Sequence, residues 1–171
     1  MTMKILIIED RKEMAEILSD ILREVSSQIY VAPTVAEAFR LLNEVPVLDL
    51  ITVDVGLPDA ASRDDVILKL PDMRSLQQDA VIVVISGVIN ADDEAIILKS
   101  GADGVLMKWD VPTGEELLRR LLGIAKAIKE TPTRWQRSIA VADYMAHRLA
   151  DFLDAHAESS RESLRASLAF H

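Results

Sequence analysis

The feature that most constrains the fold is an alternation of short apolar runs with longer helical patterns. Five runs of four or five residues, rich in β-branched side chains, are nearly continuous in apolar character: 5–8, 28–32, 50–53, 81–85 and 104–107. Such continuous runs are typical of strands buried on both faces of a sheet. Strands that alternate with helices predict right-handed crossovers and an α/β fold, with an open, doubly wound parallel sheet covered by helices on both faces.

Helical periodicity or a capping-box pattern predicts three of the intervening helices. Apolar residues repeat at helical spacing through residues 12–24, which predicts an amphipathic first helix. Thr34 with Glu37, and Thr113 with Glu116, each form a capping-box pattern before an apolar stripe. These two patterns predict the starts of the second and fifth helices.

Helix-breaking residues shape the other two helical segments. Pro71 lies in the middle of residues 62–77, so the third helix is predicted to be broken or short. Ser100-Gly101 follows residues 91–99 and predicts the end of the fourth helix.

Composition narrows the class of protein. The chain has 171 residues, half of them hydrophobic, which suffices for one good core and a small appendage. Its net charge of −9 disfavours nucleic acid as a partner, and the absence of cysteine excludes disulfides and thiolate metal sites. The apolar run at residues 5–8 is too short for a signal peptide or a membrane span. We expect a cytoplasmic protein that does not contact membranes.

Polar residues with complementary chemistry lie at four strand ends. Glu9 and Asp10 follow the first run, Asp54 the third, Ser86 the fourth and Lys108 the fifth. In open parallel sheets the functional site lies outside the carboxyl ends of the strands, so these side chains are predicted to converge. Together they are the groups needed to phosphorylate a carboxylate.

In its motifs the chain resembles the receiver domain of bacterial two-component response regulators. The matching segments are Ile7-Ile8-Glu9-Asp10, Val53-Asp54-Val55-Gly56-Leu57-Pro58, Val84-Ile85-Ser86-Gly87, and Gly101-Ala102-Asp103-Gly104 leading to Lys108. The resemblance covers about residues 3–129. It implies a flavodoxin-like sheet of strand order 2-1-3-4-5, a receiver domain at 1–129 and a helical extension at 130–171.

The resemblance also implies a role for each site residue. Asp54 would accept a phosphoryl group from a sensor histidine kinase, a phosphotransfer protein or a small phosphodonor, and Ser86 and Lys108 would contact its oxygens. A carboxylate attacking an anionic phosphoryl group needs a cation between them, and Mg²⁺ prefers oxygen ligands. The expected ligands of Mg²⁺ are the side chains of Glu9, Asp10 and Asp54 and the backbone carbonyl of Gly56.

Each residue taken singly has a simpler interpretation. Asp54 could cap a turn, Asp10 could be the N-cap of the first helix, and Lys108 could be a solvated surface charge. Ser86 beside Gly87 is a common loop pair. The joint occurrence of the residues in the right order favours the receiver, because single motifs have a high false-positive rate.

Two positions depart from the usual receiver pattern. Val105 stands where the family often has an aromatic residue that swings inward, and Trp109 follows Lys108 where proline is usual. In addition, the segment 59–65 lacks the glycine usual in receivers and looks longer than the corresponding segment of the family. These departures leave phosphorylation chemistry plausible and put the usual signalling route in question.

The segment 130–171 does not resemble a known output module. It has no basic stripe and no helix-turn-helix pattern, so DNA binding is not expected. One predicted helical face is apolar, lined by Trp135, Ile139, Ala142, Met145, Leu149, Phe152 and Leu153. This face would fold back on the receiver, form a homodimer or dock on another protein, and the last two are favoured.

Three functional hypotheses follow. The leading one is a response regulator in which phosphorylation of Asp54 switches conformation and association with a downstream protein, without turnover as an enzyme. The second is a constitutive interaction module on a receiver scaffold. The third is a phosphorelay intermediate, for which His147 is a weak internal candidate beside its interpretation as an ordinary helical residue.

Overall fold

A five-stranded parallel sheet forms the centre of the molecule. The computed structural model describes residues 3–87, 91–108 and 114–130. The strands are β1 (Lys4–Ile8), β2 (Gln28–Ala32), β3 (Leu50–Val53), β4 (Val81–Ser86) and β5 (Gly104–Met107). All pairs are parallel and the order is β2-β1-β3-β4-β5, which confirms the predicted fold class.

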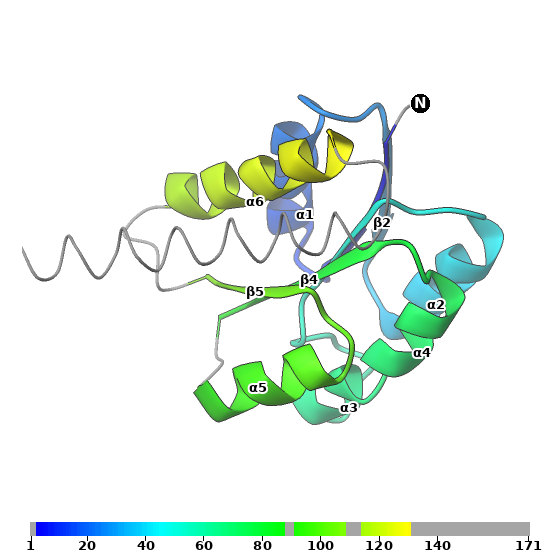
Figure 1. Cartoon of the computed structure of the whole chain (residues 1–171). Coiled ribbons are helices and arrows are strands. Elements are labelled where there is room, and N and C mark those ends of the chain that lie inside the picture. The colour runs from blue at the N-terminus through cyan, green and yellow to red at the C-terminus, as the bar shows by residue number, and fades with distance from the viewer. Residues whose placement is uncertain (1–2, 88–90, 109–113, 131–171) are drawn as a thin grey trace, which may run out of the picture.

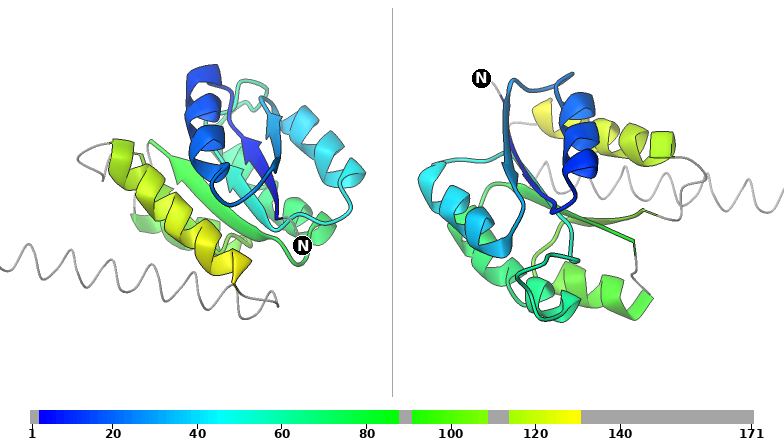
Figure 2. Two further views of the ribbon diagram at one scale, coloured as in Figure 1. Left: turned by 90° about the horizontal axis from the view of Figure 1, so that it is seen from above. Right: turned by 180° about the vertical axis from the view of Figure 1, so that it is seen from behind.

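Helices cover both faces of this sheet (Figures 1 and 2). The helices α1 (Lys12–Leu22) and α6 (Gly114–Lys129) lie side by side on one face. The other face carries α2 (Val35–Glu44), α3 (Arg63–Ile67), α4 (Leu70–Leu76) and α5 (Ala91–Lys99).

The core is divided by the sheet into two apolar layers. On β1, Ile5 and Ile7 pack with α1 and α6, whereas Leu6 and Ile8 pack with α2 to α5. All four side chains are buried because side chains alternate between the faces of a strand and helices cover both faces. This burial explains the continuous apolar runs of the sequence.

The predicted start of α2 is correct, but only half of its capping box forms. Thr34 is the N-cap and its hydroxyl oxygen accepts a hydrogen bond from Glu37 N at 3.1 Å. The Glu37 carboxylate pairs with Arg40 one turn further on and does not return to the N-cap. Thr113, predicted to cap the fifth helix, lies outside the described residues, and α6 is described from Gly114.

The breaks in the helical segments are also as predicted. Residues 62–77 form two short helices, with Pro71 in the first turn of α4, where a missing N–H has no cost. Gly101 ends α5 with φ of 109°, in the left-handed region where glycine has no Cβ penalty. Within the described part of the chain no helix has the length and apolarity needed to cross a membrane.

The predicted apolar face of residues 131–171, with His147, lies outside the described residues, as does Trp109.

Candidate functional site

Backbone pairing at the strand ends brings the predicted residues to one rim of the sheet. Asp54 N donates to Ile8 O at 2.9 Å, which places Asp54 beside the end of β1. Lys108 N donates to Ser86 O at 2.8 Å, which places Lys108 beside the end of β4. Because β1, β3, β4 and β5 are adjacent, these contacts carry the side chains that follow them to a single site.

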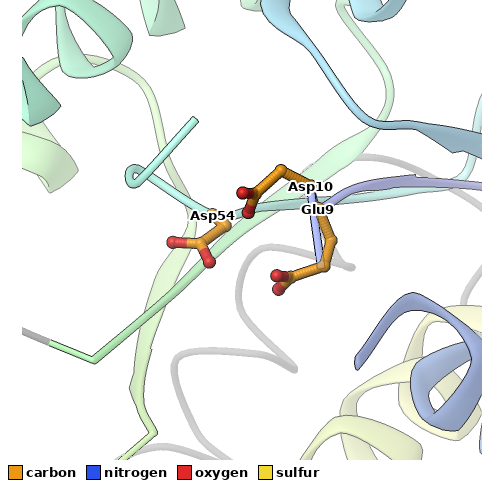
Figure 3. Close-up of side chains that lie close together, drawn as sticks. All are labelled: Glu9, Asp10 and Asp54. Atoms are coloured by element: carbon orange, nitrogen blue, oxygen red, sulfur yellow. The ribbon is translucent and has the colours of Figure 1, made fainter. Parts of the chain in front are cut away.

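Three carboxyl groups gather at this rim (Figure 3). Glu9, Asp10 and Asp54 each offer an oxygen within 4.8 Å of the others. Glu9 and Asp54 are buried, while Asp10 is exposed at the mouth of the site. An all-oxygen set that is open to solvent fits a hard divalent cation such as Mg²⁺, which binds one or two carboxylates and retains several waters.

Lys108 joins two of these carboxylates. Its Nζ lies 2.9 Å from Glu9 Oε2 and also donates to Asp54 Oδ2. The side chains of Lys108, Glu9 and Asp54 are 10%, 1% and 10% exposed. Lys108 is therefore no solvated surface charge but a largely buried cation that contacts two buried anions.

The burial of these charges changes their proton affinity. Burial and the neighbouring Asp54 charge raise the pKa of Glu9 above its ordinary value, against the opposing hydrogen bond from Lys108. The pKa of Lys108 is raised, because its hydrogen bonds to Asp54 and Glu9 outweigh the lowering effect of burial. Lys108 is thus held as a cation.

Asp54 also caps the turn that follows β3. Its Oδ1 accepts a hydrogen bond from Gly56 N at 3.0 Å, so the simpler interpretation of this residue is present together with the contact to Lys108. The corresponding interpretation of Asp10 is wrong, since Arg11 is the N-cap of α1 and no side chain caps that helix end.

The remaining predicted residues lie around this centre. Ser86 is buried at the last position of β4, and Gly87 after it is half-buried. Val105 is packed in the core layer beneath α2 to α5, next to Val84 of β4 in the strand register. A small aliphatic side chain therefore occupies the position at which receivers often have an aromatic residue.

One contact of the site was not predicted from the sequence. The sequence predicts Glu9 as a metal ligand, which stays a prediction, and in the structure its carboxylate accepts a hydrogen bond from Lys108, a residue 99 positions away. No local pattern signals that pairing, because it depends on the approach of β1, β3 and β5 in the sheet.

Comparison with protein families decides the class. Residues 5–121 match the family described as the response regulator receiver domain. The chain belongs to the response regulator receiver family. A comparison with curated proteins finds no match.

Solved structures of response regulators share the receiver fold. A protein from Burkholderia pseudomallei, with a phosphorylated aspartic acid, calcium ion and citrate, is 26% identical (TM-score 0.59, 74% of this chain and 71% of that chain). The phosphorylated cyanobacterial phytochrome response regulator RcpA is 21% identical (TM-score 0.65, 78% and 99%). A CheY-like receiver from Methanospirillum hungatei is 19% identical (TM-score 0.62, 76% and 98%). The last two likenesses support the fold alone.

Proposed function

We propose that this receiver is a phosphorylation-controlled switch of two-component signalling in which Asp54 accepts the phosphoryl group. The phosphodonor would be a sensor histidine kinase, a phosphotransfer protein or a small acyl phosphate. The observation that carries the proposal is the convergence of the Glu9, Asp10 and Asp54 carboxyl groups with the Lys108 ammonium at one rim.

The transfer follows from the positions of these groups. A carboxylate oxygen of Asp54 attacks phosphorus, an acyl phosphate forms, and the bond from phosphorus to the donor breaks with its electron pair leaving on the donor. Lys108 now donates to Asp54 Oδ2, and it would transfer this hydrogen bond to an oxygen of the phosphoryl group. The Ser86 hydroxyl would donate a hydrogen bond to another oxygen of the phosphoryl group. Such chemistry requires positioning and charge neutralisation more than covalent help from the protein.

A divalent cation fits the acidic side of the same site. Glu9, Asp10, Asp54 and the backbone carbonyl of Gly56 are the groups that would hold Mg²⁺. When bound, Mg²⁺ would neutralise charge between the attacking carboxylate and the phosphoryl oxygens. Exposed Asp10 is the carboxylate free to approach such an ion without first leaving Lys108.

The output is proposed to be a protein–protein association. The receiver would occupy residues 1–129, and the segment 130–171 would transmit the state by homodimerisation or by docking on a downstream protein. Its sequence favours neither nucleic acid nor membrane as a partner, and the protein would accept a phosphoryl group without turnover of a substrate.

Intact-mass measurement tests the acceptor and the metal together. The protein is incubated with acetyl phosphate and Mg²⁺, with Asp54→Ala and a sample containing chelator as controls. One added phosphoryl group, lost in both controls, is expected. A folded protein that gains no phosphoryl group from acetyl phosphate or from any histidine kinase would overturn the switch and favour a constitutive interaction module.

Stoichiometric passage of the group from Asp54 to a histidine would instead favour the phosphorelay. Loss of that passage in His147→Ala would make the relay internal to this chain.

A further inference from the structure

An acidic side chain joins the loop after β3 to the neighbouring helix α2. Asp59 Oδ1 accepts a hydrogen bond from Val35 N at 2.9 Å, and Asp59 Oδ2 accepts one from Ala36 N at 3.0 Å. Val35 and Ala36 are the first two residues of α2, whose amide groups have no partner within the helix. The helix dipole also favours a carboxylate at this end. Both oxygens of Asp59 are thus used to attach the loop to α2.

The same loop carries a backbone group that is expected to bind the metal ion. Gly56 lies three residues before Asp59 and is exposed, and its carbonyl is among the proposed ligands of Mg²⁺. Glycine has no Cβ, so its backbone has more freedom than that of other residues. The direction of the Gly56 carbonyl must therefore be set by the attachments on either side of it.

The loop is attached on both sides of Gly56. On the first side, Asp54 N donates to Ile8 O at 2.9 Å, and Asp54 Oδ1 accepts a hydrogen bond from Gly56 N at 3.0 Å. On the second side, Leu57 is buried in the apolar layer beneath α2 to α5, and Asp59 makes its two bonds to α2. The segment that carries the Gly56 carbonyl is therefore fixed to β1 at one end and to α2 at the other.

The loop borders an open groove on the side of α3. The groove lies between the loop, the start of α2 and the end of α3, and its lining includes Ala60, Ala61 and Leu68. Leu68 is 71% exposed, so apolar packing on this side is light. Segments with few buried apolar contacts open at low free-energy cost. The hydrogen bonds of Asp59 are therefore expected to limit the motion of the loop after Leu57.

We propose that Asp59 is a positioning residue for the metal ion at the phosphorylation site. By attaching the loop to α2, it limits the positions that the Gly56 carbonyl can take beside Asp54. Asp59 acts through the backbone of the loop and is not itself a ligand. The start of α2 thereby supports the site. The inference rests on the proposed function, since it takes Asp54 as the acceptor and the Gly56 carbonyl as a ligand of Mg²⁺.

Amide hydrogen exchange of the metal-free protein tests the attachment of the loop. The Gly56 amide reports on the loop, because it is hydrogen-bonded to Asp54 Oδ1. Asp59→Ala is expected to speed exchange of this amide about fivefold, the change that corresponds to losing a typical helix cap. Thr34→Ala is the matched control, since Thr34 caps the same helix through a bond to Glu37 N that lies outside the loop. This control should leave exchange of the Gly56 amide unchanged.

Calorimetric titration with Mg²⁺ tests the effect on the metal ion. Asp59→Ala is expected to raise the dissociation constant about fivefold, less than the roughly 10–100-fold effect of a group bonded directly to a ligand. Asp59→Asn keeps a side-chain oxygen that can cap α2, so it should stay within about twofold of wild type, as should Thr34→Ala.

Labelling by acetyl phosphate separates metal binding from the transfer step. Asp59→Ala should need about fivefold more Mg²⁺ than wild type for half-maximal labelling of Asp54, in proportion to its weaker binding. At saturating Mg²⁺ its rate of labelling should approach that of wild type, because the acceptor and Lys108 are intact. Circular dichroism confirms that each variant is folded.

Several results would overturn the positioning role. Unchanged exchange of the Gly56 amide, or unchanged affinity for Mg²⁺, in a folded Asp59→Ala protein would show that the cap does not position the ligand. An equal loss of affinity in Thr34→Ala would assign the effect to the stability of α2. An equal loss in Asp59→Asn would assign it to the negative charge of Asp59.

The measurements on wild type distinguish this inference from the proposed function. A wild-type protein that binds no Mg²⁺ and accepts no phosphoryl group would overturn the proposed function, and the positioning role would fail with it. A wild-type protein that does both, with an Asp59→Ala variant that matches it in every measurement, would overturn the positioning role alone.

Discussion

At the level of single residues, the site carries more negative than positive charge, because Lys108 offers one positive charge to two carboxylates. Two buried carboxylates, Glu9 and Asp54, share one ammonium group. Desolvation of charge is costly, and removing one partner of a buried pair leaves the other uncompensated. Each of these side chains is therefore expected to affect stability as well as chemistry.

Glu9→Gln is expected to become more stable relative to wild type as pH rises above 4.5, the ordinary pKa of the carboxyl group. The pKa of Glu9 is raised in the folded protein, chiefly by burial, so its contribution to stability is present at low pH and is lost as pH rises through the raised value. Urea unfolding of both proteins from pH 4 to 8, without divalent cations, measures the difference. A constant difference across this range would contradict the assignment.

Thr52→Val is expected to stabilise the protein by about 1 kcal/mol, since a buried hydroxyl without a partner costs about 1–3 kcal/mol. Within the described part of the chain, Thr52 Oγ1 is buried and has no hydrogen-bond partner. Valine has nearly the same shape and no polar atom. Urea unfolding measures the gain, and Thr52→Ser, which keeps the hydroxyl and loses a methyl group, should be destabilised. A less stable valine variant would show that the hydroxyl is satisfied.

At the level of secondary-structure elements, the loop after β3 is attached to its neighbours by polar side chains. Asp59 accepts hydrogen bonds from Val35 N at 2.9 Å and Ala36 N at 3.0 Å, the first two amides of α2. Together with Thr34, it satisfies three amide groups that the helix itself leaves without partners. The loop that follows Asp54 and the start of α2 are therefore linked.

Asp59→Ala is expected to lose about 1 kcal/mol of unfolding free energy at neutral pH, the usual effect of removing a helix cap. The two amide hydrogen bonds lower the pKa of Asp59 despite the raising effect of burial. Its contribution is thus present above the ordinary value of 3.8 and is lost as pH falls through the lowered pKa. Chemical unfolding at pH 7 and pH 3 tests this, with Asp79→Ala as an exposed control. An equal loss at both pH values would contradict a charged cap.

Element boundaries were predictable where local chemistry decides them. The ends of β2, β3 and β5 agree with the sequence, and β4 extends one residue further, to Ser86. Contacts between distant elements were not predictable. Arg74, for example, donates to Gly101 O at 2.8 Å and pairs with Asp103, which joins α4 to the turn before β5. No periodicity or spacing signals such a pair, because it depends on the final packing of helix against sheet.

At the level of the whole molecule, the residues of the candidate site were predictable from the sequence, whereas the contacts that link the site to distant elements were not. The polar residues at the strand ends were predictable, because a parallel sheet brings all carboxyl ends to one edge. The bond from Lys108 to Glu9, the cap from Asp59 and the ion pair from Arg63 to Asp93 arise only once the sheet and helices have assembled. The sequence motifs predict the residues of the site, but they do not predict these long-range contacts.

Mg²⁺ is expected to raise the stability of the whole protein, because a ligand that binds only the folded state stabilises it. At ten times its dissociation constant the gain is about 1.4 kcal/mol. Thermal unfolding with and without Mg²⁺ measures it. Asp10→Asn should lose most of the stability gained from Mg²⁺. In metal-free buffer its stability should be closer to that of wild type than the stability of Glu9 variants is, since Asp10 is exposed. The same gain in Asp10→Asn as in wild type would place the ion elsewhere, and Asp20→Asn serves as an exposed control.

The most direct measurement is a crystal structure of the adduct with beryllium trifluoride and Mg²⁺. We expect beryllium bonded to a carboxylate oxygen of Asp54 and Lys108 moved from Asp54 Oδ2 to a fluoride. We expect Mg²⁺ to be held by the acidic group of Glu9, Asp10 and Asp54 together with the Gly56 carbonyl. An adduct on another carboxylate, or Lys108 still bound to Glu9 and Asp54 beside an unmodified Asp54, would contradict the central claim that Asp54 is the acceptor.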